Sequence, residues 1–476
     1  MEFRVLGCEE IQQVHEASLE ILSTVGVHIP HEQALDLFRD AGAQVDREKQ
    51  HVKIPEPIVS NALEVCGKQF TIYGRDRLKR AEFGVGKRNY NTTAGQAYWL
   101  DDDSGHRRYA TLGDLVTAAR LADALPRINI VGAMSDPKEL PPEYRCVFVA
   151  AELLKNTTKP VTFWFHDRPS SRFVLDLFQI VAGSAEAAGA YPFGFPLLEP
   201  ISPLRFPHHG VDLLFETCRV PLPVPVGPMA QIGTTAPGTL AGTLAQENAE
   251  ILAGLCLVQL IRPGTPVCYG GIPHAFDMKT TQMIFAGPEQ ALMAVAMTQI
   301  GKFYRLPVYV NVGLTDSKIA DAQAGLEVGI TLAFGAMAGA DIFGHLGICG
   351  VDQGTSFSML MMQHEIIGYV ERLLQGILID RERLGIDVIR QVGPGGNFLA
   401  ETHTVQNFRR ELWFPELLDR DYFETWAHGG CKTMRQRCHD LKNTILRERH
   451  PEPLPDDIAR DVDRLLEDAK RHLVNV

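Results

Sequence analysis

Aromatic, acidic, amide and imidazole side chains recur in this chain directly after short runs of apolar residues. They occur in FWFH at 163–166, LLEP at 197–200, MAQIG at 229–233, CYGGIPH at 268–274 and FGHLGICGVDQGTSF at 343–357. The candidate binding residues from these runs are Trp164, His166, Glu199, Gln231, Tyr269, His274, His345, Asp352 and Phe357. Since the set is rich in aromatic rings and poor in arginine, it suits a cation without hydrogen-bond donors, such as a quaternary ammonium.

These candidates divide into three expected roles. Trp164, Tyr269 and Phe357 are expected to form part of a cation cage, each ring contributing roughly 0.5–2 kcal/mol. Glu199 or Asp352 would balance the charge of the cation. The far end of the ligand, for instance a carboxylate, would be held by a polar group of four residues: His166, His274, Gln231 and His345. No side chain is assigned as a catalytic acid or base, and each candidate has a structural alternative as a core, capping or salt-bridge residue.

Other chemistries have weaker support in the sequence. The three candidate histidines come from separate runs without helical H-x-x-H spacing, and the nine cysteines form no C-x-x-C pair, which disfavours a metal site and a disulfide framework. No G-x-G-x-x-G and no G-x-x-x-x-G-K-[ST] motif occurs, so NAD and ATP are not expected. Lys318 is a candidate Schiff-base lysine, although it follows its apolar run by several residues. The glycine-rich stretch at 393–398 is interpreted as a loop.

Seven apolar, strand-like runs alternate with amphipathic helical runs after residue 111. The expected strands are Ile128–Ala133, Val161–His166, Pro192–Leu198, Val224–Met229, Val267–Gly271, Val308–Gly313 and Ile342–Gly344, and helices are expected at 143–155, 171–183, 238–262, 287–304 and 320–339. Such alternation predicts right-handed βαβ units that close into an α/β fold, a (β/α)₈ TIM barrel. An eighth strand gives no clear signal. The candidate residues would then share one mouth, at the carboxyl ends of the strands, where many glycines are expected to leave a wide opening. A doubly wound open sheet is the competing architecture.

The chain divides into three expected regions. Residues 1–110 form an N-terminal cap with helices at 9–25, 31–42 and 55–66 and short strands at 52–54 and 70–73. The barrel core is assigned to 111–376, and 377–476 is a C-terminal helical extension that completes or covers the barrel. Within that extension, 406–449 is dense in Arg, Glu and Lys. This density indicates a solvated face, or alternatively a lid or a docking surface for a partner.

Composition places the chain among ordinary globular enzymes. It has 476 residues, 45% of them hydrophobic and 22% charged. With 46 Lys and Arg against 58 Asp and Glu, the formal net charge is −12, which disfavours a nucleic-acid partner. The N-terminal sequence MEFRVLGCEE lacks the apolar core of a signal peptide, and the longest apolar run is too short to cross a bilayer. We therefore expect a cytoplasmic protein with no membrane association.

Several runs resemble the trimethylamine methyltransferase superfamily over nearly the whole chain. They are FTIYGRD at 70–76, LDDDSGHRRYATLGDL at 100–115, EPISPL at 199–204, GTTAPGTLAGTLAQENAEILAG at 233–254, RPGTPVCYGG at 262–271, TDSKIADAQAG at 315–325, VGPGGNFLAETHT at 392–404 and ELWFP at 411–415. The resemblance implies a barrel that transfers a methyl group from an amine to the corrinoid (cobalamin) of a separate corrinoid-binding protein. It does not assign substrate contacts residue by residue.

The chain resembles the branch of this superfamily that lacks pyrrolysine. Other members carry pyrrolysine in the loop that corresponds roughly to 349–356, where this chain reads CGVDQGTS. The resemblance therefore implies a quaternary amine as substrate, with glycine betaine as the best example. That division is chemically sensible, because a quaternary nitrogen leaves as a neutral tertiary amine and needs no general acid.

Several alternatives stay open at this point. Proline betaine, carnitine, γ-butyrobetaine and choline are further candidate substrates, and a homo-oligomer is compatible with the sequence. A non-catalytic barrel that binds or senses a quaternary amine is a second class of function. A Schiff-base lyase that uses Lys318 is a third.

Overall fold

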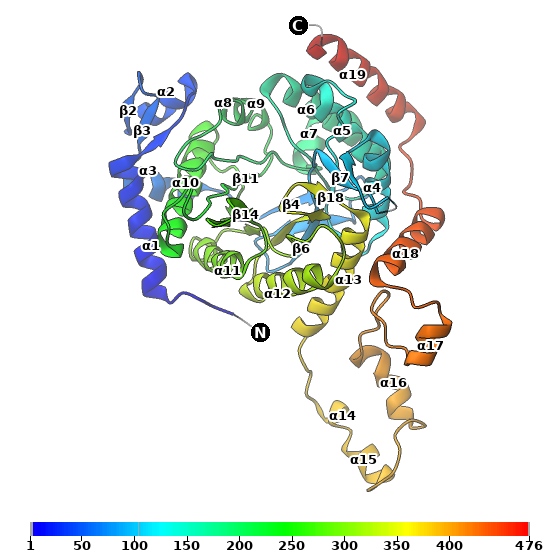
Figure 1. Ribbon diagram of the computed structural model, residues 1–476. Coiled ribbons are helices and arrows are strands. Elements are labelled where there is room, and N and C mark those ends of the chain that lie inside the picture. Colours follow the sequence, from blue (N-terminus) through cyan, green and yellow to red (C-terminus); the bar gives the residue numbers. More distant parts are fainter. Residues whose placement is uncertain (1–2, 103, 475–476) are drawn as a thin grey trace.

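The strands at the centre of the molecule form a closed parallel barrel (Figure 1). The computed structural model describes residues 3–102 and 104–474, and within them the barrel has eight extended segments. In chain order these are β6 (Asn89–Thr92), β9 (Val131–Gly132), β10 (Val161–Thr162), the segment 193–198, β11 (Val224–Val226), β12 (Val267–Gly271), β15 (Val308–Val310) and β16 (Ile342–Leu346). The predicted (β/α)₈ barrel is confirmed.

Backbone hydrogen bonds join all eight segments into a ring. A continuous sheet runs in the order β11-β12-β15-β16-β6, and β9 pairs with β10 in parallel. A parallel bridge between Asn91 and Ile130 joins β6 to β9, and another between Leu198 and Val226 joins the fourth segment to β11. The remaining gap closes where the Val161 amide donates to the Phe193 carbonyl at 2.8 Å.

The strand without a clear signal in the sequence is β6. It lies at Asn89–Thr92, before the expected start of the barrel at residue 111, and pairs in parallel with β16. Its sequence, NYNT, has no apolar run because Asn89 and Asn91 alternate with Tyr90, whose ring packs on Phe343 with centroids 5.0 Å apart. A barrel that began at residue 111 would lack this strand.

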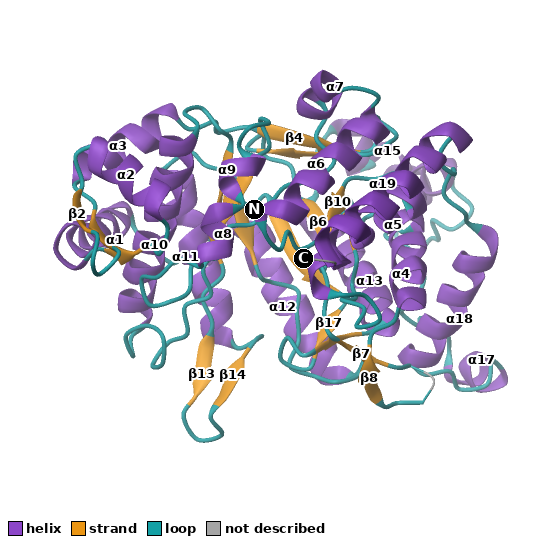
Figure 2. Cartoon of the chain, turned by 90° about the horizontal axis from the view of Figure 1, so that it is seen from above, coloured by secondary structure: helices purple, strands orange, loops and turns teal. Residues whose placement is uncertain are grey.

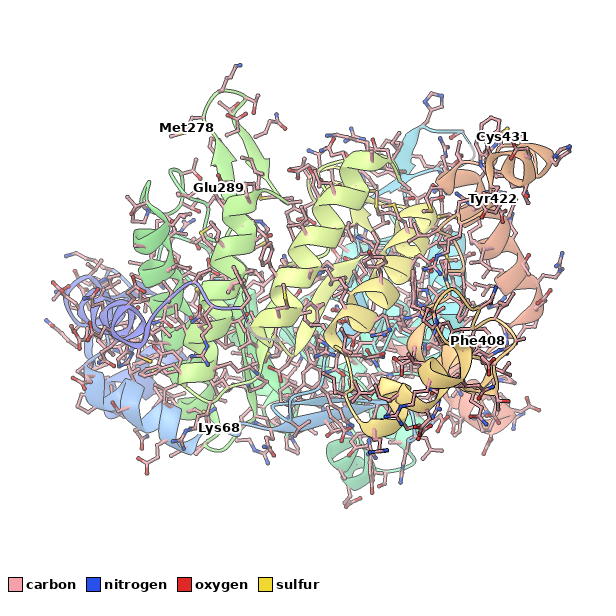
Figure 3. The ribbon with its side chains drawn as sticks, turned by 90° about the horizontal axis from the view of Figure 1, so that it is seen from below. Lys68, Met278, Glu289, Phe408, Tyr422 and Cys431 are labelled. Atoms are coloured by element: carbon pink, nitrogen blue, oxygen red, sulfur yellow. The ribbon has the colours of Figure 1, made fainter. Side chains whose placement is uncertain are left out.

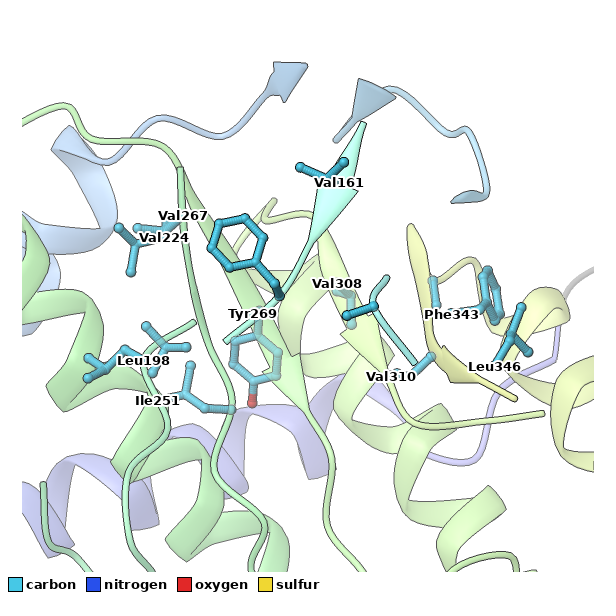
Figure 4. Close-up of a cluster of buried hydrophobic side chains, with 14 of the residues drawn as sticks. Val161, Leu198, Val224, Ile251, Val267, Tyr269, Val308, Val310, Phe343 and Leu346 are labelled. Carbon is cyan, nitrogen blue, oxygen red and sulfur yellow. The ribbon is translucent and has the colours of Figure 1, made fainter. Parts of the chain in front are cut away.

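Helices cover the outside of the barrel in the order expected for βα units. They are α4 (Leu112–Ala124), α5 (Pro142–Asn156), α6 (Arg168–Ala182), α8 (His208–Asp212) with α9 (Leu214–Thr217), α10 (Leu240–Ile261), α11 (Pro288–Phe303), α12 (Ala322–Ala338) and α13 (Phe357–Leu374). The main core lies between strands and helices, where outward-facing residues such as Val224, Val267 and Val308 are buried (Figure 4). Helix α10 is long and apolar enough to cross a membrane, but 83% of that stretch is buried inside the molecule.

The N-terminal region packs beside α10, outside the barrel. It contains α1 (Cys8–Glu20), a π-helical turn (Ile21–Val25), β1 (Val27–His28), α2 (Glu32–Asp40), β2 (Gln44–Asp46), β3 (His51–Lys53) and α3 (Glu56–Val65). The hairpin of β4 (Phe70–Tyr73) and β5 (Arg80–Phe83) lies at the amino ends of the barrel strands (Figure 2). There the Gly84 amide donates to Asp341 Oδ1 at 2.9 Å. A short helix, α7 (Ala185–Ala190), follows α6.

Three pairs of short strands lie at the carboxyl ends of the barrel strands. They are β7 (Tyr98–Leu100) with β8 (Arg107–Tyr109), β13 (Ala275–Asp277) with β14 (Gln282–Ile284), and β17 (Ile348–Cys349) with β18 (Gly354–Thr355). The β13–β14 hairpin projects furthest and carries the exposed Met278 at its tip (Figure 3). This end of the barrel is the mouth.

The C-terminal region contains α14 (Arg381–Leu384), α15 (Ile386–Val392), α16 (Thr402–Glu411), α17 (Phe423–His428), α18 (Met434–Glu448) and α19 (Asp456–Val474). Helix α18 packs on α13 and α4, and α19 packs on α5 and α6. Residues 376–415, which we call the arm, project away from the barrel and carry α14, α15 and α16 (Figure 1). Neither α14 nor α15 contains a buried residue.

Candidate active site

A narrow cavity runs inside the barrel; the space free of protein atoms there is about 470 Å³, part of which is open to solvent. Its walls are the inward-facing residues of the strands together with the bottom hairpin. They are Phe70, Phe83, Asn91, Ala94, Thr162, Phe163, Trp164, Phe195, Leu197, Pro225, Cys268, Tyr309, Ile342 and His345. The lining is largely aromatic and contains no lysine or arginine among the residues that the structure describes, so it suits an apolar or cationic ligand.

Trp164 and His345 lie together where the cavity approaches the mouth. The Trp164 indole is fixed because Nε1 donates to the Gly95 carbonyl at 2.9 Å. Its ring stacks on that of His345, with centroids 5.9 Å apart and planes 25° apart. The other side of His345 is bonded to the Tyr309 hydroxyl through Nε2. Burial lowers the pKa of His345 to about 4, so the imidazole is neutral at pH 7.

Two carboxyl groups, those of Glu199 and Asp352, accompany these rings. Burial raises the pKa of Glu199 to about 7, and repulsion by Asp352 adds to the increase. Burial also raises the pKa of Asp352 to about 7, although Gln96 Nε2 donates to its Oδ1 at 2.8 Å. The charges of both acids raise the pKa of the buried Tyr309 hydroxyl, although neither acid belongs to the cavity wall itself. A bound cation would favour the ionised form of both acids.

The chain around Asp352 has an unusual backbone. His345, Val351 and Asp352 have φ angles of 67°, 61° and 60°, in the left-handed region. This conformation is rare for a β-branched residue such as Val351. Each such residue costs of the order of 1–3 kcal/mol and persists only where the surrounding structure enforces it, often at a functional site. Here the turn between β17 and β18 brings the Asp352 carboxyl to Gln96.

Two members of the expected cation cage lie elsewhere. Tyr269 is fully buried on the outer side of β12, where its hydroxyl donates to Asn248 Oδ1 in α10 at 2.8 Å (Figure 4). Phe357 begins α13 and packs edge-on against Trp99, with ring centroids 4.6 Å apart. Both rings belong to the core between strands and helices, so neither is available to a ligand in the cavity. These two expectations are corrected.

The remaining polar candidates surround the mouth without lining the cavity. His166 is bonded to the Pro142 carbonyl at 3.1 Å. Gln231 contacts Met283 in the β13–β14 hairpin through Nε2, at 3.5 Å from the sulfur. His274 is fully buried and stacks on Phe285 with centroids 4.7 Å apart, and burial lowers its pKa to about 3. Gln231 and His274 are joined by a backbone bridge, and none of the three residues belongs to the cavity wall.

Lys318 is exposed, and its ammonium donates to the Asp316 carbonyl at 2.9 Å. It is not in the cavity, where a Schiff-base lysine would be shielded from water. Among the described residues, no three His, Cys, Asp or Glu side chains are grouped closely enough to hold a metal ion.

Several glycines at the strand ends serve packing instead of widening the mouth. A Cβ on Gly344 would lie 2.2 Å from the Tyr309 ring, and one on Gly270 would lie 2.5 Å from the Val226 carbonyl. These contacts hold the strands and the Tyr309 ring close together. The expectation that the glycines leave an open mouth is therefore wrong at these two positions.

Of the residues that line the cavity, only Trp164 and His345 are among the sequence candidates, and the polar or aromatic residues that the sequence analysis misses include Asn91, Gln96, Phe195 and Tyr309. Tyr309 was detectable, because in VYVNV the valines face the helices and the residues between them face the barrel interior. The same alternation places Asn91 inside. The candidates were taken from positions after the strands, whereas most of the cavity wall belongs to the strands themselves.

Comparisons with known proteins agree with this architecture. A family model described as "Trimethylamine methyltransferase (MTTB)" matches residues 1–473. The trimethylamine methyltransferase MttB of Desulfitobacterium hafniense (strain DSM 10664 / DCB-2) is 30% identical over 463 residues, covering 97% of this chain and 93% of that protein. The glycine betaine methyltransferase of Desulfitobacterium hafniense (strain Y51) is 31% identical over 458 residues, covering 96% and 95%. The crystal structure of the Methanosarcina barkeri monomethylamine methyltransferase (MtmB) covers 98% of this chain and 89% of its own, with a TM-score of 0.54 at 11% identity.

Proposed function

Because this chain belongs to the trimethylamine methyltransferase family, we propose that it transfers a methyl group from a quaternary amine to the corrinoid of a partner protein. The observation that supports this most is the pair of partly buried acids, Glu199 and Asp352, beside an aromatic cavity whose lining has no basic group among the described residues. Such a site stabilises a permanent cation by charge and by ring contacts. The loop at 349–356 contains only standard residues, in keeping with a quaternary substrate.

The residues of the cavity have positioning roles in this proposal. Trp164 and Tyr309 hold the methylated nitrogen among π-faces, and the neutral His345 keeps the Trp164 ring in place. Glu199 and Asp352 balance the charge. When bound at the mouth, the reduced corrinoid of the partner supplies the nucleophile that accepts the methyl group. The leaving tertiary amine is neutral, so none of these side chains has to deliver a proton.

The mouth is where a corrinoid-binding protein would dock. The β13–β14 hairpin and the β7–β8 hairpin lie on either side of it (Figure 2). We also propose that the chain works as a homo-oligomer in the cytoplasm. Support for an oligomer comes from the arm, whose exposed apolar side chains are Ile377, Leu378, Ile379, Leu384, Ile386, Ile389, Phe398, Leu399, Val405, Leu412 and Phe414.

The test is methyl transfer to free cob(I)alamin from a panel of quaternary amines. We expect at least one amine to give the methylcobalamin spectrum, and trimethylamine to give a rate at least tenfold lower. An Asp352→Asn variant should lose most of this activity, whereas Glu48→Gln, which removes an exposed acid far from the cavity, should keep it. If a quaternary amine binds tightly but none is demethylated, the chain is a binding or sensing protein instead.

A further inference from the structure

We propose that the amine accepted by this cavity is a quaternary ammonium with an uncharged, hydroxyl-bearing tail, of the choline class, and not a betaine with a carboxylate. The inference rests on the proposed function, because it concerns the substrate of the same site. Two independent features of the described residues support it: the distribution of charge around the cavity and a buried hydrogen-bond acceptor in its wall.

The charge around the cavity is of one sign. Glu199 and Asp352 lie beside the cavity as acidic groups, and no lysine or arginine lines it among the described residues. Two basic residues lie near the loop that carries Asp352, and both have other partners. Lys318 is exposed and bonded to a backbone carbonyl, and Arg107 is exposed, bonded to Gln353 and stacked over Tyr98.

A betaine would bring a further negative charge, that of its carboxylate, to a site that already has two acids. Its carboxylate would have to leave water without a cationic partner and would face two acids. His345 does not compensate, because burial keeps it neutral at pH 7. An uncharged tail avoids this repulsion, while the ammonium group keeps its attraction to Glu199 and Asp352.

The buried acceptor is the side-chain oxygen of Asn91. Asn91 lines the cavity and is 4% exposed. Its Nδ2 donates to the Thr92 carbonyl at 3.3 Å, while Oδ1 has no hydrogen-bond partner among the described residues. The Oδ1 atom of Asn311, the residue two positions after Tyr309, is likewise buried and without a partner in that part of the chain.

A ligand hydroxyl would satisfy such an acceptor, because it has a proton to donate. A carboxylate has none at neutral pH, and a bare tetramethylammonium ion has none either. The acceptor therefore favours binding of choline over both glycine betaine and tetramethylammonium. The acids disfavour only the betaine, because it alone has a carboxylate.

The experiment measures binding and turnover of three probes with the full-length protein: choline, glycine betaine and tetramethylammonium. Dissociation constants come from isothermal titration calorimetry, and methyl transfer to cob(I)alamin is followed in parallel. We expect choline to bind at least tenfold more tightly than glycine betaine and at least threefold more tightly than tetramethylammonium. Equal or tighter binding of glycine betaine would overturn the proposal. Equal binding of tetramethylammonium would overturn the assignment of the hydroxyl.

Failure of the proposed function gives a different result. In that case none of the three amines methylates cob(I)alamin, and the binding ratios still decide between the choline class and the betaines. The two outcomes are therefore read from separate measurements on the same samples.

Variants connect each ratio to its cause. Asp352→Asn and Glu199→Gln should each reduce the preference for choline over glycine betaine by at least threefold, because each removes repulsion of the carboxylate. Asn91→Leu, which is close in volume, should instead reduce the preference for choline over tetramethylammonium. Glu48→Gln is the matched control and should leave all ratios unchanged. Should Asn91→Leu fail to fold, Asn91→Ser keeps an acceptor and should retain the preference for choline.

Discussion

Trp164 is the aromatic residue whose contact with a bound cation can be tested most directly by substitution. Its ring lines the cavity beside His345. Removal of one ring that contacts a cation costs roughly 0.5–2 kcal/mol, so Trp164→Ala should raise the KM for a quaternary amine about 2–30-fold. Steady-state methyl transfer to cob(I)alamin measures the change.

Tyr269→Phe is the comparison for that variant, since both residues were candidates for the same cage. The Tyr269 hydroxyl bonds Asn248 outside the barrel, so its loss should leave the KM unchanged and lower the free energy of unfolding by about 1 kcal/mol. A large increase in KM for Tyr269→Phe would contradict the placement of this ring in the core.

The pH dependence of stability follows from the two partly buried acids beside the cavity. A carboxyl group whose pKa is raised to about 7 in the folded chain, as for Glu199, favours folding while it is protonated. This contribution is complete below the unfolded pKa of about 4.3 and is lost as the pH rises through 7. Glutamine does not ionise, so the Glu199→Gln variant lacks this pH-dependent loss of stability. Between pH 5 and pH 8 its free energy of unfolding should therefore rise by on the order of 2 kcal/mol relative to that of the parent protein. Urea unfolding at several pH values gives the difference, and a constant offset would show that Glu199 does not titrate in this range.

At the scale of elements, the barrel depends on close backbone approach between neighbouring strands. A Cβ on Gly132 in β9 would lie 2.0 Å from the Thr93 carbonyl and 2.4 Å from the Thr92 carbonyl of the β6 segment. Because backbone atoms cannot move aside without separation of the two strands, Gly132→Ala should lower the free energy of unfolding by roughly 3 kcal/mol or more. Denaturant unfolding checks this value.

Gly325→Ala provides the opposite case within the same fold. Gly325 lies in α12 with no atom within 4 Å of an added Cβ. Alanine is better suited to a helix than glycine by about 1 kcal/mol, so this variant should be slightly more stable than the parent. Similar losses for both variants would mean that β6 and β9 are not packed as described.

The elements also show how far the sequence alone could lead. Seven strands and five of the helices between them were predictable, because buried parallel strands are apolar runs and these helices are amphipathic or long, whereas the short α8 and α9 gave no such signal. Strand β6 was missed because its inward residues, Asn89 and Asn91, are polar. Asn89 donates a hydrogen bond to the Asp341 carbonyl, and Asn91 lines the cavity. Trp164, Glu199, His345 and Asp352 were found because they follow strands, whereas Tyr269 and Phe357 also follow that pattern but face the helices. Side-chain direction at a strand end depends on register, which an apolar run does not specify.

For the whole molecule, the arm sets the expected state of assembly. Ile377, Ile379 and Leu399 are 86%, 77% and 80% exposed, and α14 and α15 contribute nothing to the core. Exposed apolar side chains in such number are normally covered by another chain. We expect the protein to elute as an oligomer, and a variant with Ile377, Leu378 and Ile379 all replaced by serine should be smaller. Light scattering after size-exclusion chromatography measures both masses, and a monomeric parent protein would contradict the expectation.

The pairing of β6 with β16 has a consequence for folding during synthesis. These strands lie about 250 residues apart along the chain, yet they pair with each other and so help to close the barrel. While the polypeptide leaves the ribosome, the growing sheet keeps two unpaired borders, which invite association with other nascent chains. The pocket wall is completed only when the segment with Ile342 emerges and meets a strand made long before. A chain truncated before that segment therefore has an open sheet with unpaired edges that is prone to aggregate. We expect such a chain to have no binding activity.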